Sequence, residues 1–157
     1  GRLRMSLSVC IFKNDKLYIS AAAMPPAYLY SAETKSVEEI EIRNLPLGGL
    51  ENEQFDLVEK SFNKGDVLVL LSDGLPEAPD LEGNLLDYQP VMDCIEKTAH
   101  LGASQVKQAL IDLADDWLGG SQNPDDITFV VFEKQPNGDK KVQKELEEKD
   151  YKKVAQA

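Results

Sequence analysis

The sequence is poor in the side chains that build thiol, histidine or zinc chemistry. It contains two cysteines, Cys10 and Cys94, and one histidine, His100, among 157 residues. The cysteines lie in apolar stretches without C-x-x-C spacing, so we expect free thiols of a reducing compartment, not a zinc site or a disulfide framework. His100 stands in "KTAHLGAS", where we expect a structural role at a helix end and no catalytic triad.

Long apolar runs are also missing, and none approaches the ~18 residues that a transmembrane helix needs. The sequence shows no signal-peptide pattern and opens with Gly1 in place of methionine, so we expect a piece excised from a longer protein. The expected location is the cytoplasm, or the cytoplasmic side of a membrane-anchored parent.

Positive charge is scarce. Against 17 basic residues stand 28 acidic ones, giving a net charge of −11. Such a surface repels phosphate backbones and anionic lipid, which argues against nucleic acid and membrane surfaces as partners. The acids suit metal cations or a basic partner, although solubility alone is the simpler interpretation.

The first half of the chain reads as six short strands. Met5, Leu7, Val9 and Ile11 alternate onto one face of the first. Turn signals separate most neighbouring strands, which favours an antiparallel meander over β-α-β units. The predicted strands are residues 4–12, 16–22, 25–33, 37–45, 54–62 and 67–72.

Helical spacing follows, over residues 87–100 and 103–120. In the second segment Val106, Leu110, Leu113 and Trp117 share one face, Ser104 lies in the expected N-cap region, and Gly119-Gly120 ends the helix. A last strand is predicted over 127–133. We therefore expect an α+β domain over residues 1–134 and a charged tail or linker over residues 135–157.

Carboxylates stand where two apolar strands end or begin. Asp73-Gly74 follows strand 67–72, and Asp125-Asp126 precedes strand 127–133. Each pair alone reads as a turn, because Asp-Gly and Asn-Pro are common turn dipeptides. Together they indicate a second interpretation, in which rigid strand ends hold carboxylates at a cleft mouth. Oxygen ligands alone favour Mg²⁺ or Mn²⁺ over zinc, and Gly74 leaves room for a metal ion and its waters.

An ordered series of motifs resembles the SpoIIE-like branch of the metal-dependent protein phosphatases, the PPM or type 2C Ser/Thr phosphatases. "KLYISAAAMPPAYLY" is similar to the family's G-x-L-x-x-x-N-A-G-H/M-x-P-P-x-L-L, and "LPLGGL" to x-P-L-G-x. "KGDVLVLLSDGLPEA" resembles x-G-D-x-L-L-L-Y-T-D-G-V-x-E-A, and "NPDDITFVVFE" resembles x-D-D-I-T-L-V-V. The resemblance covers roughly residues 4–133 and only the C-terminal part of the family's domain.

The resemblance implies part of an α-β-β-α sandwich with mostly antiparallel sheets, lacking the N-terminal portion of the domain. By motif position, Asp73 and Asp125 are the expected catalytic metal ligands, Asp126 is a third, and Gly74 supports the turn. The implied cofactor is a pair of Mn²⁺ or Mg²⁺ ions, whose activated water hydrolyses phosphoserine or phosphothreonine.

The chain also departs from the family pattern. The family's G-D-x-x-D-like and D-x-x-G-H-G-like motifs do not occur, so we expect this fragment alone to be inactive. Ala22-Ala23-Met24 replaces the family's A-G-H/M, Ser72 replaces a threonine, and Pro76 stiffens the loop after Asp73.

Three functions are weighed. The first is a fragment of a bacterial signalling phosphatase, with a sensor module upstream and a phosphorylated protein substrate, such as an anti-sigma-factor antagonist. The second is a degenerate, non-catalytic partner-binding module. The third, a receiver-like phosphoacceptor, fits poorly, because receivers alternate strands with helices and carry their acid pair near the start. Apolar sheet edges left by a missing half-domain make a homodimer a further expectation.

Overall fold

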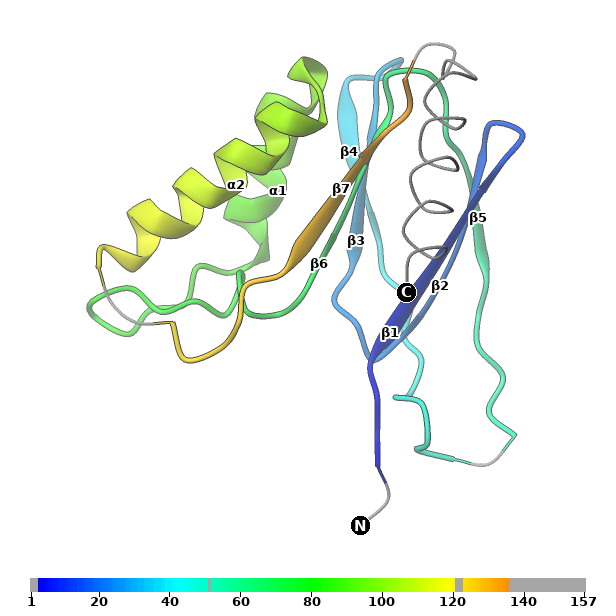
Figure 1. Cartoon of the computed structure of the whole chain (residues 1–157), viewed down its shortest axis with the longest axis horizontal. Helices are drawn as coiled ribbons and strands as arrows, with labels where there is room; N and C mark the ends of the chain where they lie inside the picture. Colours follow the sequence, from blue (N-terminus) through cyan, green and yellow to red (C-terminus); the bar gives the residue numbers. More distant parts are fainter. Residues whose placement is uncertain (1–2, 51, 121–122, 136–157) are drawn as a thin grey trace, which may run out of the picture.

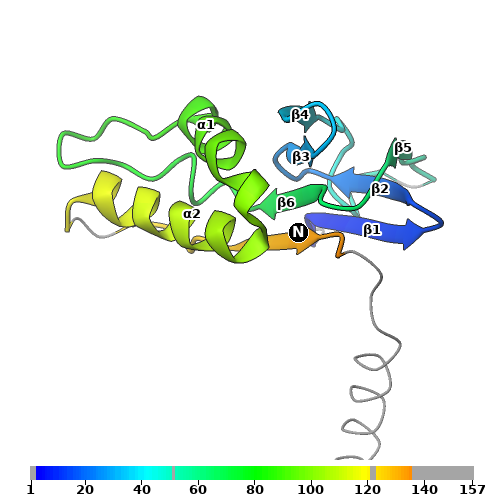
Figure 2. The ribbon, with the colours of Figure 1, turned by 90° about the horizontal axis from the view of Figure 1, so that it is seen from above.

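Two antiparallel sheets pack face to face, and a pair of helices covers the outer face of one of them (Figure 1). The computed structural model describes residues 3–50, 52–120 and 123–135. Seen from above, these residues form three layers, with helices on one side, a sheet in the middle and a second sheet beyond it (Figure 2). The predicted α+β class and the antiparallel sheets are confirmed, with both helices on one outer face.

The strands do not run as a simple meander. The first sheet has the order β1-β2-β5, with β1 (Leu7–Lys13), β2 (Lys16–Ala22) and β5 (Val58–Ser61). The second has the order β4-β3-β6-β7, with β3 (Ala27–Ser31), β4 (Ser36–Ile40), β6 (Val67–Leu71) and β7 (Phe129–Glu133). The chain thus changes sheet after β2, after β4 and after β5, and β6 joins the sheet that β3 began.

The sheet in the middle is buried on both faces. Val67 and Val69 of β6 face the helices, where they pack with Val91 and Leu110. Leu68, between them, faces the other sheet and joins a second apolar cluster with Leu17 and Ile19 of β2. Because successive strand residues point to opposite faces, this double burial explains why β6 is an almost continuous apolar run.

The helices follow the predicted apolar spacing. Helix α1 (Tyr88–Thr98) leads through a short 3₁₀ turn (Ala99–Leu101) into α2 (Ala103–Leu118), which Gly119 ends in the left-handed conformation. The predicted N-cap region at Ser104 is wrong, because α2 begins one residue earlier. Its first amide, Ala103 N, donates to Glu133 Oε2 of β7 at 2.9 Å, so a carboxylate distant in sequence caps the helix.

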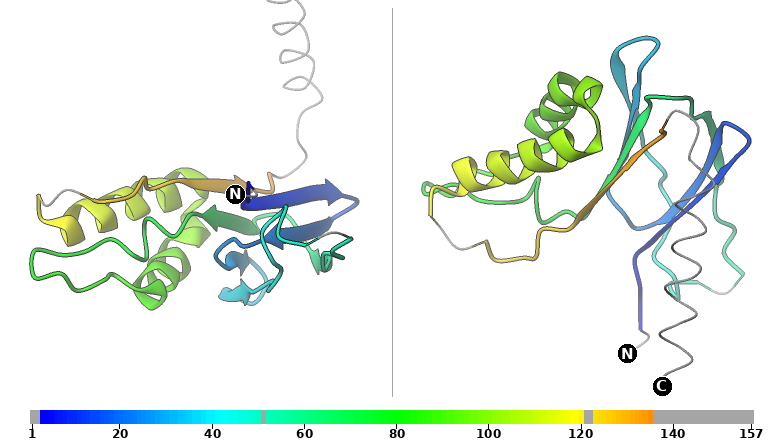
Figure 3. Two further views of the ribbon diagram at one scale, coloured as in Figure 1. Left: turned by 90° about the horizontal axis from the view of Figure 1, so that it is seen from below. Right: turned by 45° about the horizontal axis from the view of Figure 1, so that its top comes forward.

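The apolar face predicted for the first strand points outward. Met5 and Ile11 are 55% and 56% exposed, while Cys10 on the opposite face packs against the cluster between the sheets. Leu57 is 66% exposed, and the predicted strand 54–62 begins only at Val58. Among the described residues, no helix lies over this outer face of the β1-β2-β5 sheet (Figure 3).

In the part of the chain that the structure describes, each sheet has an unpaired edge strand on the same side of the sandwich. Strands β1 and β7 are the outer strands of their sheets and lie on one side of the sandwich (Figures 2 and 3). A shallow, mainly apolar groove of about 280 Å³ lies there, lined by residues that include Leu7, Met24, Leu70 and Phe129. Both edges carry backbone groups that can pair with a further strand.

The predicted charged segment 135–157 lies outside the described residues, apart from residue 135. Within the described ranges, neither helix is both long enough and apolar enough to cross a membrane.

Candidate active site

The end of β6 and the start of β7 lie side by side and bring the two predicted acid motifs together. Leu71 pairs with Phe129 as the last pair of the ladder. Beyond it, Ser72 N donates to Thr128 O at 2.8 Å, and Thr128 N donates to Ser72 Oγ at 3.1 Å. The same hydroxyl donates to Asp126 O at 3.2 Å. Ser72 therefore ties the segment before Asp73 to the segment that carries Asp126.

Gly74 is needed because two backbones approach closely. A Cβ atom added there would lie 2.3 Å from Asp126 O and 2.9 Å from Asp126 C. On the other side, Asn123 Nδ2 donates to Gly74 O at 3.0 Å. From the sequence, we expected Gly74 to leave room for a metal ion. The structure shows that Gly74 also packs directly against the backbone of the second acid motif, at Asp126.

The three predicted ligands, Asp73, Asp125 and Asp126, are all exposed. Asp125 Oδ1 accepts a hydrogen bond of 2.8 Å from Asp126 N, which holds the acid pair in a local turn. No ion pair involves these carboxylates within the described ranges. The described part of the chain contains no group of three or more His, Cys, Asp or Glu side chains that could hold a metal ion. The structure thus places the acid motifs together, and their role as metal ligands stays a prediction.

The loop after Asp73 is fixed to the start of α1. Glu77 N donates to Asp73 O at 2.9 Å and closes a turn over the buried Pro76. Pro76 O accepts from Asp87 N at 2.7 Å, and Ala78 O accepts from Trp117 Nε1 at 3.0 Å. These hydrogen bonds fix the loop that carries Glu77 to the residues that begin α1, and the stiffening role expected of Pro76 stays a prediction.

Two tyrosines, Tyr28 and Tyr88, lie within electrostatic range of acids of this loop. No role was predicted for either from the sequence. Tyr28 of β3 is 0% exposed, and its hydroxyl has no hydrogen-bond partner in the described part of the chain. Burial raises the pKa of Tyr28, and the negative charge of Glu39, with contributions from Tyr88 and Asp87, raises it further.

Tyr88, the first residue of α1, packs against the same core. Burial also raises the pKa of Tyr88, and four carboxylates add to this, those of Glu77, Asp73, Asp87 and Glu39 in decreasing order. Of these four, Asp73 and Glu77 stand in a motif that the sequence analysis singled out, whereas Asp87 and Glu39 do not. Tyr28 and Glu39 come from a separate hairpin, and no local pattern connects them to Asp73.

The turn that departs from the family pattern has an unusual backbone. Ala23, which stands where the family has glycine, adopts φ 49°. Its amide donates to Asn44 O at 3.1 Å, and Asn44 Nδ2 donates to Ala21 O at 2.9 Å. The turn between β2 and β3 thus keeps a conformation that favours glycine, although alanine occupies it.

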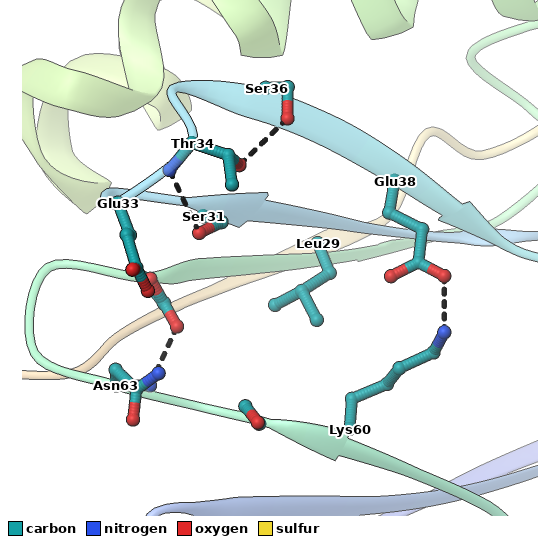
Figure 4. Close-up of a pocket in the computed structure, with 10 residues that line it drawn as sticks. Leu29, Ser31, Glu33, Thr34, Ser36, Glu38, Lys60 and Asn63 are labelled. Atoms are coloured by element: carbon teal, nitrogen blue, oxygen red, sulfur yellow. Dashed lines mark hydrogen bonds and ion pairs between the residues drawn. The ribbon is translucent and has the colours of Figure 1, made fainter.

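A polar cavity of about 380 Å³ lies at the opposite end of β6, between the hairpin of β3 and β4 and the end of β5 (Figure 4). Lys60 and Glu38 form an ion pair across it and connect the two sheets. Asp66 is 3% exposed, and it accepts from Ala32 N at 2.9 Å and from Asn63 N at 2.6 Å. Its carboxylate therefore fastens two turns, which is a structural role remote from Asp73.

The family and the solved structures that resemble the chain agree with one another. The profile of the family described as Stage II sporulation protein E (SpoIIE) matches residues 3–135. No curated protein matches the chain.

Among solved structures, the chain is similar to the SiaA-PP2C domain of Pseudomonas aeruginosa, with 19% identity and a TM-score of 0.65, over 76% of this chain and 46% of that one. It is similar to the phosphatase domain of the cell fate determinant SpoIIE from Bacillus subtilis, with 18% identity and a TM-score of 0.59, over 86% and 59% of the two chains. It also resembles a structure of the RsbU and RsbW domains of a Mycobacterium tuberculosis protein, with 22% identity and a TM-score of 0.65, over 85% and 37%.

The TM-scores of 0.59 to 0.65 establish a shared fold. The chain spans about half the length of the first structures it matches, 46% and 59%. The match to the family profile extends over most of the chain. The protein therefore belongs to the SpoIIE family, and it carries part of the fold of the type 2C phosphatase domains.

Proposed function

We propose that the chain is part of a metal-dependent protein serine/threonine phosphatase of bacterial signalling. Asp73 and Asp125 are the proposed catalytic metal ligands, with Asp126 beside them and Gly74 supporting the turn. The observation that carries the proposal is the 2.3 Å approach of a Gly74 Cβ position to Asp126 O, which sets the two acid motifs against each other. Turn formation alone explains an acid in either motif, and it is the contact between the two motifs that favours a shared metal site.

The donor set suits Mn²⁺ or Mg²⁺, because the three side chains offer only carboxylate oxygens. Such an ion would polarise the phosphoryl group and lower the pKa of a water. The chain's own contribution is to hold acids on strand ends that β6 and β7 fix by their ladder, so that little reorganisation is needed on binding. Since the described residues include no three-ligand group, further ligands or waters must complete the shell.

The chain covers only part of its structural relatives, so the remaining features of the whole protein are also proposals. They are a phosphorylated protein substrate, such as an anti-sigma-factor antagonist, and a sensor module upstream in the parent chain, in the cytoplasm or on the cytoplasmic side of a membrane. A homodimer is proposed from the adjoining open edges of β1 and β7. We expect the 157-residue chain alone to be inactive, because two divalent ions carry four positive charges and only three candidate carboxylates, those of Asp73, Asp125 and Asp126, are proposed for the site.

A non-catalytic partner-binding module is the second candidate. The observations that favour it are the missing three-ligand group among the described residues and the alanine at φ 49° in the turn after β2. Both candidates use the same scaffold, so metal binding at Asp73 separates them.

The test is a Mn²⁺ titration of the ¹⁵N-labelled chain, followed by paramagnetic broadening of its amide signals. We expect selective broadening at residues 72–75 and 124–127, its loss in Asp73→Asn, and its retention in Asp56→Asn, which removes an exposed acid elsewhere. Asn serves in turns as well as Asp does, so the melting temperature of Asp73→Asn should stay within about 2 °C of wild type. Broadening that is unchanged in Asp73→Asn would leave only the non-catalytic candidate.

A further inference from the structure

Four carboxylates from three segments of the chain lie toward one end of the middle sheet. Glu39 stands near the end of β4, Asp73 follows β6, Glu77 lies in the loop after it, and Asp87 precedes α1. The loop contacts described above bind Glu77 to Asp73 and Asp87 to Pro76. None of these acids has an ion-pair partner in the part of the chain that the structure describes. Together these carboxylates give this end of the sheet a negative potential, which attracts a cation.

An unpartnered tyrosine hydroxyl lies on the same face of the sheet as one of these acids. Tyr28 and Glu39 are direct partners across β3 and β4, so their side chains leave the sheet on the same face. That face is the one against which α1 packs, since Tyr28 shares a cluster with Val91 and Ile95. The Tyr28 hydroxyl lies within electrostatic range of Glu39 and Asp87, and it is fully buried without a hydrogen-bond partner in the described residues. A buried hydroxyl left unpaired is costly, so a ligand that satisfies it gains binding free energy.

We propose that this tyrosine–acid patch, made of Glu39, Glu77, Asp87, Tyr88 and the hydroxyl of Tyr28, binds a guanidinium or ammonium side chain of the protein substrate. The proposal rests on the proposed phosphatase function, because the patch adjoins Asp73 and would bind the substrate next to its phosphorylated residue. Arginine fits best, since its planar fork donates to several carboxylates and stacks on a tyrosine ring. Because Tyr28 is 0% exposed, an N–H of the arginine reaches its hydroxyl only through a water.

A metal ion fits this patch less well. The described residues contain no group of three acids that could hold one, so the carboxylates are spread more widely than a metal shell requires. A guanidinium has five donors that point outward within one plane, so it can stack on an aromatic ring while donating to acids around the edge of that ring.

The test measures binding of a short peptide by calorimetry, without metal and without turnover. The probe is an acetylated peptide with one arginine two residues from a serine, and its control carries citrulline, which keeps the shape and removes the charge. We expect the arginine peptide to bind about tenfold more tightly, a difference of about 1.4 kcal/mol. Glu39→Gln and Glu77→Gln should each remove most of this preference, while Glu33→Gln on the same hairpin and Glu96→Gln on α1 should keep it.

Tyr28→Phe provides a second variant that retains the aromatic core. We expect it to fold normally and to weaken binding of the arginine peptide about threefold or more, because the hydroxyl partner is lost. Equal binding of the arginine and citrulline peptides would overturn the proposal. So would equal losses in the Glu33→Gln and Glu96→Gln controls, which would show a response to overall charge alone.

Spermidine is the third arm. Binding of spermidine to the same residues as tightly as the peptide would assign the patch to free polyamines and overturn the substrate proposal. Failure here is distinguishable from failure of the phosphatase proposal, because Mn²⁺ broadening around Asp73 is measured independently and does not involve Glu39.

Discussion

Gly74→Ala tests whether the contact between the two acid motifs holds the candidate site together. The φ angle of Gly74 lies outside the left-handed region, so alanine can adopt its backbone, and the cost comes from the added methyl group alone. That carbon would lie 2.3 Å from Asp126 O, whereas ordinary contacts of this kind begin at 3.4 Å. The Asp126 carbonyl must therefore move by about 1 Å.

The structure lets us estimate the penalty. Overpacking of a tightly packed contact costs about 1–3 kcal/mol. Moving the Asp126 carbonyl also breaks its hydrogen bond with Ser72 Oγ, 3.2 Å long, which contributes about 1 kcal/mol. The expected loss of unfolding free energy is thus about 2–4 kcal/mol. For a chain of this size the melting temperature should fall by roughly 4–16 °C.

The assay is urea unfolding of wild type, Gly74→Ala and a control, Gly83→Ala. Gly83 has φ 87° and nothing within 4 Å of its Cβ position, so alanine there adds backbone strain without contact. That strain costs about 1–2 kcal/mol. We expect Gly74→Ala to lose more stability than the control and to lose the Mn²⁺ broadening at residues 124–127. A smaller loss than in Gly83→Ala would refute the close approach on which the site depends.

Alternation along the sequence predicted most strands because it is a local property. The structure has β2 over Lys16–Ala22, the predicted range, and the apolar run of β6 lies within its predicted strand. Alternation shows which residues share a face, and it does not show what covers that face. Met5, Leu7, Val9 and Ile11 do share one, yet it is the outer face of the first sheet.

The strand order depends on contacts between distant segments. The turn signals after β2 and β4 look alike in sequence whether the next strand joins the same sheet or the opposite one. Pairing of Tyr28 with both Glu39 and Val69 places β3 between β4 and β6, and only the folded chain reveals that neighbourhood. Glu133 was not predicted as the cap of α2 for the same reason, because it lies 30 residues from Ala103 in the sequence.

The acids at the strand ends of the candidate site could be predicted from the sequence, and the residues that other segments bring to it could not. Asp73 and Asp125 can be singled out from the sequence, because a carboxylate at the border of an apolar strand is locally unusual. The contact of Gly74 with Asp126 depends on the register of β6 against β7, which pairs Leu71 with Phe129. Glu39 and Tyr28 reach the same end from another hairpin, and their acidic and aromatic character alone is too common to single them out.

Two further substitutions test backbone strain and the buried hydroxyl. Ala23→Gly should raise the free energy of unfolding in urea by about 0.5–1 kcal/mol, because φ 49° favours glycine by more than the extra chain entropy costs; a loss of stability would show that the turn is unstrained. Tyr28→Phe should raise it by about 1–2 kcal/mol at pH 7, since it removes a hydroxyl that is buried without a partner in the described residues. The same variant should alter the alkaline limb. The folded state raises the pKa of Tyr28 above its ordinary value of 10.0, so the folded chain keeps a proton that the unfolded chain releases. The stability from this proton is complete below about pH 10 and declines as the pH rises further, so wild type should lose stability there faster than Tyr28→Phe. Parallel urea titrations at pH 7 and pH 11 measure both effects. A variant less stable than wild type at pH 7 would mean that the hydroxyl already has a partner, such as a buried water, and would remove the hydroxyl from the tyrosine–acid patch.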